Sequence, residues 1–227
     1  MISAPEKFRC EFCKASFSRE VSILKHACEQ KTRHMQRDHK QVKIAFMVFG
    51  RVYAKFRRPP PSYDSFARNG MYRAFVKFAK HIIDLSMIDP MSYVDFLLRT
   101  EVPIDRWINA YLYARYIHEQ NKNEGPWEAV ERSILLMQEW SIETCADFRD
   151  FFHEITPVQA TTWIINGRIS PWLLFIAPNA PNMMKRLNPE QQQLVRQTVD
   201  PVFWRAKMAR HRDKVTDIRA FLIDERI

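Results

Sequence analysis

Glycine is scarce in this chain of 227 residues, which has only four: Gly50, Gly70, Gly125 and Gly167. Loops that cradle phosphate in Rossmann and P-loop folds need several glycines within one turn, so the sequence excludes nucleotide sites of those types. All-β folds are disfavoured as well, because their many tight turns require residues with positive φ.

Long apolar segments are also missing. The longest runs, Ile44–Phe49 and Trp172–Ala177, are far shorter than the ~18 residues that a membrane-spanning helix needs. The segment Met1–Lys7 lacks the apolar stretch of a secretory signal. The sequence therefore predicts a soluble, intracellular protein without a membrane partner.

Acidic residues are scarce in one part of the chain. Residues 1–58 hold fourteen Lys and Arg but five Asp and Glu, whereas residues 59–227 hold twenty-one of each kind. The whole net charge of +9 lies in that first part, which ends at the proline run Pro59–Pro61. This gradient predicts an N-terminal module for a polyanion, most commonly nucleic acid. A solvated basic face that maintains solubility is the alternative.

Cysteine occurs four times, and three of the four lie within nineteen residues, at Cys10, Cys13 and Cys28. A clustered C-x2-C in an intracellular chain indicates metal binding or redox chemistry before a disulfide. Redox chemistry is disfavoured because no βαβ pattern surrounds the motif. Cys145 stands apart and is expected to be an ordinary buried thiol.

The spacing around this cluster resembles the two-Cys-two-His zinc finger over residues 8–34. The matching positions are Phe8, Cys10, Cys13, Phe17, Ile23 and His26. The resemblance implies a short ββα-like unit in which two thiolates on a tight turn and an imidazole on a helix hold Zn²⁺ tetrahedrally. The metal would supply folding energy that so short a segment lacks.

The fourth ligand departs from this family, whose second His would fall at positions 30 to 32, where no good zinc ligand stands. We expect Cys28 in its place. Because residues two apart on a helix point about 200° away from each other, this choice requires the helix to end or tighten near His26. His34 is the alternative, but it lies about 12 Å farther along a continuous helix, which would have to break.

The resemblance also implies which side chains face base edges in the major groove of DNA. These would be Arg19, Ser22 and Lys25, at helix positions −1, 3 and 6 of the family. Arg19 could pair with guanine in two hydrogen bonds. One finger covers about three base pairs, and single fingers also serve as protein-binding modules.

The next stretch adds basic residues to this module. Apolar positions recur at helical spacing from Val42 to Phe56, so we expect one amphipathic helix from about residue 30 to 57, basic at its start and core-facing later. Its expected phosphate contacts are Lys31, Arg33, Arg37, Lys40 and Lys43. A solvated helix face without a ligand is the alternative.

Beyond residue 62, helices follow one another. A capping residue or glycine precedes a proline at Asp89-Pro90, Gly125-Pro126, Thr156-Pro157, Ser170-Pro171, Asn188-Pro189 and Asp200-Pro201, a pattern typical of helix starts. We therefore expect an all-α bundle of about eight helices. The expected domains are a zinc finger at 1–30, a basic connecting helix at 31–58 and an all-α body at 62–227.

Catalytic motifs were sought and not found: the sequence has no H-E-x-x-H, no G-x-S-x-G and no P-loop. The body, in phrases such as Phe75–Asp84 and Gly167–Leu174, faintly resembles uncharacterised proteins of tailed bacteriophages. That resemblance implies no activity. It implies the cytoplasm of a bacterial host as the location, although the nucleus is not excluded.

These observations favour a zinc-dependent protein that binds nucleic acid, with DNA as the expected partner and the helical body as a scaffold or a site for a protein partner. A structural or adaptor protein of a phage assembly or transcription complex is the alternative, in which the finger contacts protein. An enzyme acting on DNA is a weaker third hypothesis, and the sequence leans against it.

Overall fold

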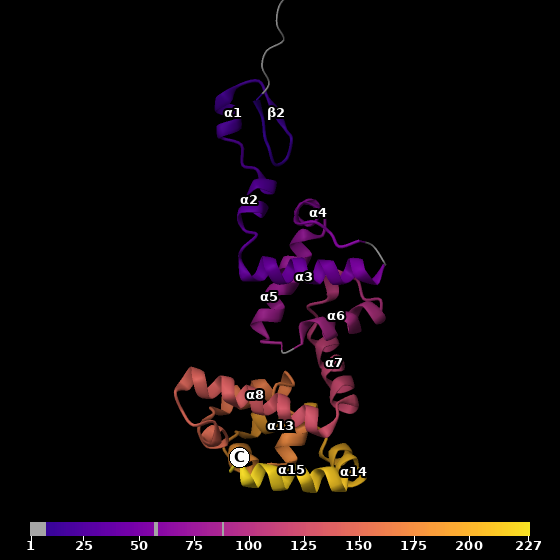
Figure 1. Ribbon diagram of the computed structural model, residues 1–227, viewed down its shortest axis with the longest axis vertical. Coiled ribbons are helices and arrows are strands. Elements are labelled where there is room, and N and C mark those ends of the chain that lie inside the picture. Colours follow the sequence, from indigo (N-terminus) through magenta and orange to yellow (C-terminus); the bar gives the residue numbers. More distant parts are fainter. Residues whose placement is uncertain (1–7, 57–58, 88) are drawn as a thin grey trace, which may run out of the picture. The chain divides into compact units, whose positions relative to one another are not determined.

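The computed structural model of the chain describes residues 8–56, 59–87 and 89–227. The chain forms two compact units, which divide between Ile108 and Asn109. Figure 1 shows that the regular structure is mainly helical, with one small two-stranded sheet near the N-terminus of the described part. The expected mainly α fold class is confirmed.

The first unit contains a β-hairpin followed by helices. In chain order its elements are β1 (Phe8–Arg9), β2 (Ser16–Phe17), α1 (Glu20–Leu24), α2 (Glu29–Met35), α3 (Lys40–Lys55), α4 (Tyr63–Arg68), α5 (Tyr72–Asp84), α6 (Pro90–Arg99) and the 3₁₀-helix η1 (Ile104–Arg106). The two strands are antiparallel, with Phe8 opposite Phe17 and Arg9 opposite Ser16.

The second unit is helical throughout its regular structure. Its elements are α7 (Ala110–Asn123), α8 (Pro126–Thr144), the 3₁₀-helix η2 (Phe148–Asp150), α9 (Phe151–Glu154), α10 (Pro157–Ile165), α11 (Pro171–Ile176), α12 (Ala180–Lys185), α13 (Pro189–Thr198), α14 (Pro201–Arg210) and α15 (Arg212–Asp224). Its core includes the fully buried Trp172, whose ring meets that of Trp204 edge to face at 5.4 Å between centroids.

All six proline positions singled out in the sequence begin helices, namely α6, α8, α10, α11, α13 and α14. In five of them the side chain of the preceding residue accepts a backbone N–H of the first turn, as Asp89 does from Ser92. Such caps satisfy amide groups that have no partner within the helix.

The number of helices exceeds the expectation of about eight, because twelve α-helices lie between Tyr63 and Asp224. Four of them, α4, α9, α11 and α12, have six residues or fewer. Fewer than two turns give too little periodicity for detection in a sequence.

The single helix expected from residue 30 to 57 is wrong, because the chain forms two helices, α2 and α3, separated by residues 36–39. The reason lies in the face that each helix buries. Arg33 is buried in α2 and Val42 is buried in α3. Residues nine apart on one continuous helix point about 180° away from each other, so the break lets both side chains pack within the same unit.

Helix α3 is part of the core of the first unit. Its apolar side chains Val42, Ala45, Val48 and Phe49 are buried, and α3 packs chiefly on α5, which it crosses in Figure 1. The core-facing later half of this segment is therefore as expected.

The boundaries of the two compact units differ from those of the domains expected from the sequence. The first unit extends to Ile108 because α4, α5 and α6 all contact α3. The limits 1–30, 31–58 and 62–227 remain predictions about functional modules. No helix in the described part of the chain is long and apolar enough to cross a bilayer.

Gly167 follows α10 with φ +73, and a Cβ there would lie 2.8 Å from Ile117 Cδ1. We expect Gly167→Ala to lower the free energy of unfolding by about 1–3 kcal/mol, because alanine is strained at positive φ. Gly50 is the control: it lies within α3, and a Cβ there meets nothing within 4 Å. Gly50→Ala should raise the same quantity by about 0.5–1 kcal/mol. Urea unfolding measures both, and shifts of the same sign would contradict the prediction.

Candidate metal centre

The hairpin positions the first two thiols. Between β1 and β2 the chain makes a tight turn, in which the Cys10 N–H donates to the Ala15 carbonyl and the Lys14 N–H to the Cys10 carbonyl, both at 2.9 Å. Lys14 takes the left-handed conformation with φ 62. This turn brings Cys10 and Cys13 to one side of the hairpin.

The second pair of ligands comes from the segment between two helices. Helix α1 ends at Leu24 and α2 begins at Glu29, so His26 and Cys28 lie on non-helical backbone. Cys28 is the N-cap of α2, and its Sγ accepts the Lys31 N–H at 3.4 Å. The helix end that a Cys28 ligand requires is therefore present.

The four side chains Cys10, Cys13, His26 and Cys28 converge, and their ligand atoms all lie within 4.8 Å of one another. The Sγ atoms of Cys10 and Cys28 are 3.7 Å apart, and Cys13 Sγ lies 3.1 Å from His26 Nε2. A tetrahedral ion with metal–sulfur bonds of ~2.3 Å separates two sulfur atoms by about 3.7 Å. The spacing therefore fits one tetrahedral cation.

His34, the alternative fourth ligand, lies outside this group. Its Nε2 is 3.6 Å from Asp64 Oδ1, and its ring contacts those of Phe12 and Tyr63 at centroid distances of 5.4 and 5.5 Å. Cys28, in contrast, is 6% exposed and lies among the other three ligands. The structure brings together the expected set with Cys28 as its fourth member.

The local hydrogen bonds affect the two thiols of the hairpin differently. The pKa of Cys10 is lowered to about 7, chiefly because the Cys13 backbone N–H stabilises the thiolate. At Cys13 the Ala15 backbone N–H lowers the pKa, but burial together with Cys10 and Cys28 raises it overall. A divalent cation at the centre would take the place of these protons, since thiolate is the form that binds metal.

Apolar contacts around the centre are few. Phe8, Phe17 and Ile23 are only half-buried, and the Phe17 ring packs against the His26 imidazole at 4.9 Å between centroids. The positions that the zinc-finger resemblance assigns to a small core are thus occupied, but they bury little surface. A metal ion would be the main source of stability for residues 8–28.

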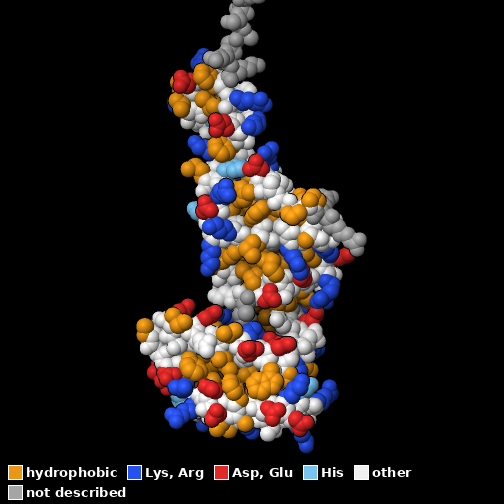
Figure 2. All heavy atoms as spheres, in the orientation of Figure 1, with side chains coloured by type: hydrophobic (Ala, Val, Ile, Leu, Met, Phe, Trp, Pro, Cys, Tyr) orange, Lys and Arg blue, Asp and Glu red, His pale blue; other side chains and the backbone are white. Residues whose placement is uncertain are grey.

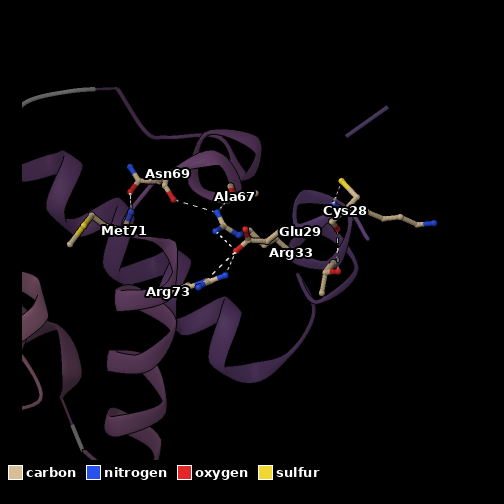
Figure 3. A network of polar contacts seen from close by, with 9 residues as sticks. Cys28, Glu29, Arg33, Ala67, Asn69, Met71 and Arg73 are labelled. Carbon is tan, nitrogen blue, oxygen red and sulfur yellow. Dashed lines mark hydrogen bonds and ion pairs between the residues drawn. The ribbon is translucent and has the colours of Figure 1, made fainter. Parts of the chain in front are cut away.

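Helix α2 connects the metal centre to the rest of the first unit (Figure 3). The Arg33 Nη1 donates to the carbonyls of Ala67 and Asn69 at 2.6 and 3.4 Å, while its Nη2 donates to Glu29 Oε1 at 2.7 Å. Arg73 Nη2 donates to the same Glu29 oxygen at 2.9 Å. The Arg33 guanidinium also lies 4.4 Å from the centre of the Tyr72 ring.

Arg33 therefore differs from its expected role as a phosphate contact. It is 9% exposed. Its guanidinium binds carbonyl groups at the C-terminal end of α4, where the helix dipole favours a cation. Through Arg33 and then Arg73, the pKa of Glu29 is held below its ordinary value. The expectation for Arg33 is corrected: the side chain is committed to internal contacts.

The other expected nucleic-acid contacts are exposed. They are Arg19, Ser22, Lys25, Lys31, Arg37, Lys40 and Lys43, and Figure 2 shows Lys and Arg side chains over the part of the molecule that contains α1 to α3. Lys43 Nζ lies 3.5 Å from Asp38 Oδ1, and Arg37 lies over the Tyr63 ring at 5.6 Å.

Sequence reasoning missed Glu29, Arg73 and Tyr63, whose hydroxyl donates to the Arg33 carbonyl at 2.5 Å. The pair Glu29 and Arg33, four residues apart, was the available signal, because such pairs meet on a helix face. Cys145 is also corrected: it is exposed, and it is the C-cap of α8 with φ 58.

Compared with known proteins, the chain matches no family model, no curated protein and no solved structure at a significant level. The faint resemblance of the helical body to phage proteins gains no support from this result. Its function is therefore inferred from the geometry of the chain itself.

The metal centre predicts how single substitutions affect metal content. Wild type and His34→Ala should each retain one equivalent of zinc, measured by elemental analysis after dialysis, whereas Cys28→Ser should retain far less. With Co²⁺ as the probe, Cys28→Ser should also lose the visible bands of a tetrahedral site. Cys145→Ser is the matched thiol control and should behave as wild type. Loss of metal in His34→Ala with retention in Cys28→Ser would contradict the assignment.

The buried Arg33 predicts a loss of stability that an exposed cation would not give. Arg33→Met should lower the free energy of unfolding of the first unit by about 1–3 kcal/mol, because charged hydrogen bonds are lost. The exposed neighbour Lys31 is the control, and Lys31→Met should change it by less than about 0.5 kcal/mol. Hydrogen exchange of the α2 and α4 amides reports both effects. Equal effects of the two substitutions would contradict the internal role of Arg33 and would support its original assignment as a phosphate contact.

Proposed function

We propose that the protein is a zinc-stabilised nucleic-acid-binding protein, with duplex DNA as the expected ligand. The observation that carries the proposal is the group of exposed cations on and beside the metal-centred module. The helical remainder would act as a scaffold or bind a protein partner. Binding to DNA implies an intracellular location.

Zinc is the metal that the donor set favours. Three thiolates and one imidazole are typical of structural zinc sites, whereas Mg²⁺ and Ca²⁺ prefer oxygen ligands. Cys10 and Cys28 are buried, and four protein ligands complete a tetrahedral shell. A closed shell of this kind supports a structural role for the metal and leaves no position for a substrate.

Phosphate contacts would come from α2, the turn after it and the first turn of α3, through Lys31, Arg37, Lys40 and Lys43. All four are exposed. In the described part of the chain one ion pair involves them, between Lys43 and Asp38; it joins two exposed side chains and contributes little in water. A phosphate group could therefore replace the Asp38 carboxylate at small cost.

Base contacts would be fewer than the zinc-finger resemblance implies. Helix α1 has only five residues; Arg19 is its N-cap and Lys25 its C-cap, so Ser22 alone of the three lies within the helix. Phosphate contacts position a protein without reading sequence. We therefore propose binding that is dominated by phosphate and tolerates many sequences, with Arg19 and Lys25 adding contacts at groove edges.

The test is a titration of a labelled random DNA duplex across ionic strength, followed by fluorescence anisotropy. The four phosphate contacts named above predict a loss of about 10²-fold in affinity between roughly 50 and 200 mM salt. Absence of DNA binding at low salt would contradict the proposal.

A paired charge removal locates the surface. Lys40→Gln with Lys43→Gln should reduce the slope of log affinity against log salt by about two units. The control pair is Lys77→Gln with Lys80→Gln, two exposed lysines of α5, and it should leave the slope unchanged. If both pairs reduce the slope equally, the binding reflects net charge and not this surface.

An adaptor protein is the second candidate, because α1 exposes apolar side chains. Val21 is 58% exposed and Leu24 77% exposed, and such side chains on a small module favour contact with a protein. Val21→Ser with Leu24→Ser should leave DNA affinity unchanged if α1 serves a protein partner. A fall in DNA affinity would instead assign α1 to the nucleic-acid surface.

A further inference from the structure

The second unit has a net basic hollow that the proposed function does not use. It has a volume of about 440 Å³ and is lined by Lys122, Phe203, Ala206, Lys207, Arg210 and His211. No acidic side chain is among these described residues. The hollow lies where the end of α7 meets α14, and its size is in the range of small-molecule sites.

Lys207 lines this hollow and is held in place by its neighbours. Its Nζ donates to the carbonyls of Asn121 and Lys122 at 2.7 and 3.0 Å, and it lies over the rings of Trp172 and Trp204 at 5.1 and 4.8 Å. An ammonium group has three N–H donors, and the two carbonyls take two of them, so the third has no oxygen acceptor among the described residues.

The charge of Lys207 is balanced only in part by a neighbouring anion. Burial lowers its pKa, and Glu124 opposes that effect only in part. Glu124 itself is held by Arg132, whose Nε and Nη2 both donate to its carboxylate at 2.8 Å. A bound anion would therefore meet a positive group that the protein leaves incompletely compensated.

Two further cationic side chains that line the hollow are free to contact a ligand. Lys122 and Arg210 are exposed, and neither charged group has an ion pair in the described part of the chain. The Lys122 ammonium lies over the Phe203 ring at 5.8 Å, which holds it beside the hollow, and the His211 ring packs on Trp172. Arg210 offers the planar fork that binds phosphate through two hydrogen bonds.

We propose that this hollow binds the phosphate group of a small phosphate monoester, such as a sugar phosphate or a mononucleotide. Three cationic side chains and a histidine around one hollow match a doubly charged oxyanion better than a single carboxylate. Lys207 would hold the phosphate from below, while Lys122 and Arg210 would close on it from the rim. The proposal is independent of the nucleic-acid surface of the first unit.

The experiment is calorimetric titration of the full-length, zinc-loaded protein at low salt with inorganic phosphate, ribose 5-phosphate and AMP. Adenosine is the ligand control, because it lacks the phosphate. We expect binding of at least one of the two monoesters and none of adenosine. Tightest binding of AMP would identify a mononucleotide ligand, and equal binding of the two monoesters would identify recognition through the phosphate alone. Absence of monoester binding, or equal binding of adenosine, would overturn the proposal.

Variants place the binding in this hollow. Lys122→Ala with Arg210→Ala should weaken monoester binding at least tenfold, and both residues are exposed, so the fold should remain intact by circular dichroism. The matched control is Arg205→Ala with Lys214→Ala, exposed cations of α14 and α15 that do not line the hollow; it should weaken binding less than twofold. Equal losses in both pairs would overturn the assignment.

DNA binding separates the two proposals. Lys122→Ala with Arg210→Ala should leave the affinity for duplex DNA and its salt dependence unchanged. If DNA affinity falls together with monoester affinity, the hollow is part of a nucleic-acid surface and the small-ligand proposal is wrong. If wild type binds AMP but not DNA, the small-ligand proposal is supported and the proposed nucleic-acid function is wrong.

Discussion

The convergence of three thiols and one imidazole organises the first part of this protein. The ligand atoms lie within 4.8 Å of one another, a distance at which thiolates without a cation would repel. The surrounding Phe8, Phe17 and Ile23 are only half-buried, so hydrophobic burial contributes little to closing the hairpin onto α1. A tetrahedral cation would resolve both problems, because it would compensate the charge of the thiolates and join four points of a short chain.

Through Cys28 the candidate metal centre is linked to structure beyond residues 8–28. It is both a candidate ligand and the N-cap of α2, and α2 carries Arg33, which binds carbonyl groups at the end of α4. A chain of hydrogen bonds and one short helix thus connects the candidate metal centre to the helical part of the first unit. The direction that α2 takes from the candidate metal centre determines where its exposed cations lie, so the metal centre and the basic surface are structurally linked.

Net charge describes this molecule poorly. Residues 1–58 carry the whole excess of +9, yet Arg33 is committed to internal contacts while Lys31, two residues away, is exposed. Residues 59–227 have no net charge, yet Lys122, Lys207 and Arg210 gather around one hollow. Which cations stay exposed and which gather around one hollow therefore depends on the folded structure and not on the net charge of a segment.

Local patterns in the sequence predicted the candidate ligands Cys10, Cys13, His26 and Cys28 and six helix starts, because a tight turn, a cap and a proline act over a few neighbouring residues. Tertiary packing decided the rest. It broke the expected helix at residues 36–39, since Arg33 and Val42 must both face the core of the first unit. It also brought Lys122 to Lys207 across 85 residues. Long-range contacts of this kind leave no periodic trace in a single sequence, so only the folded chain reveals them.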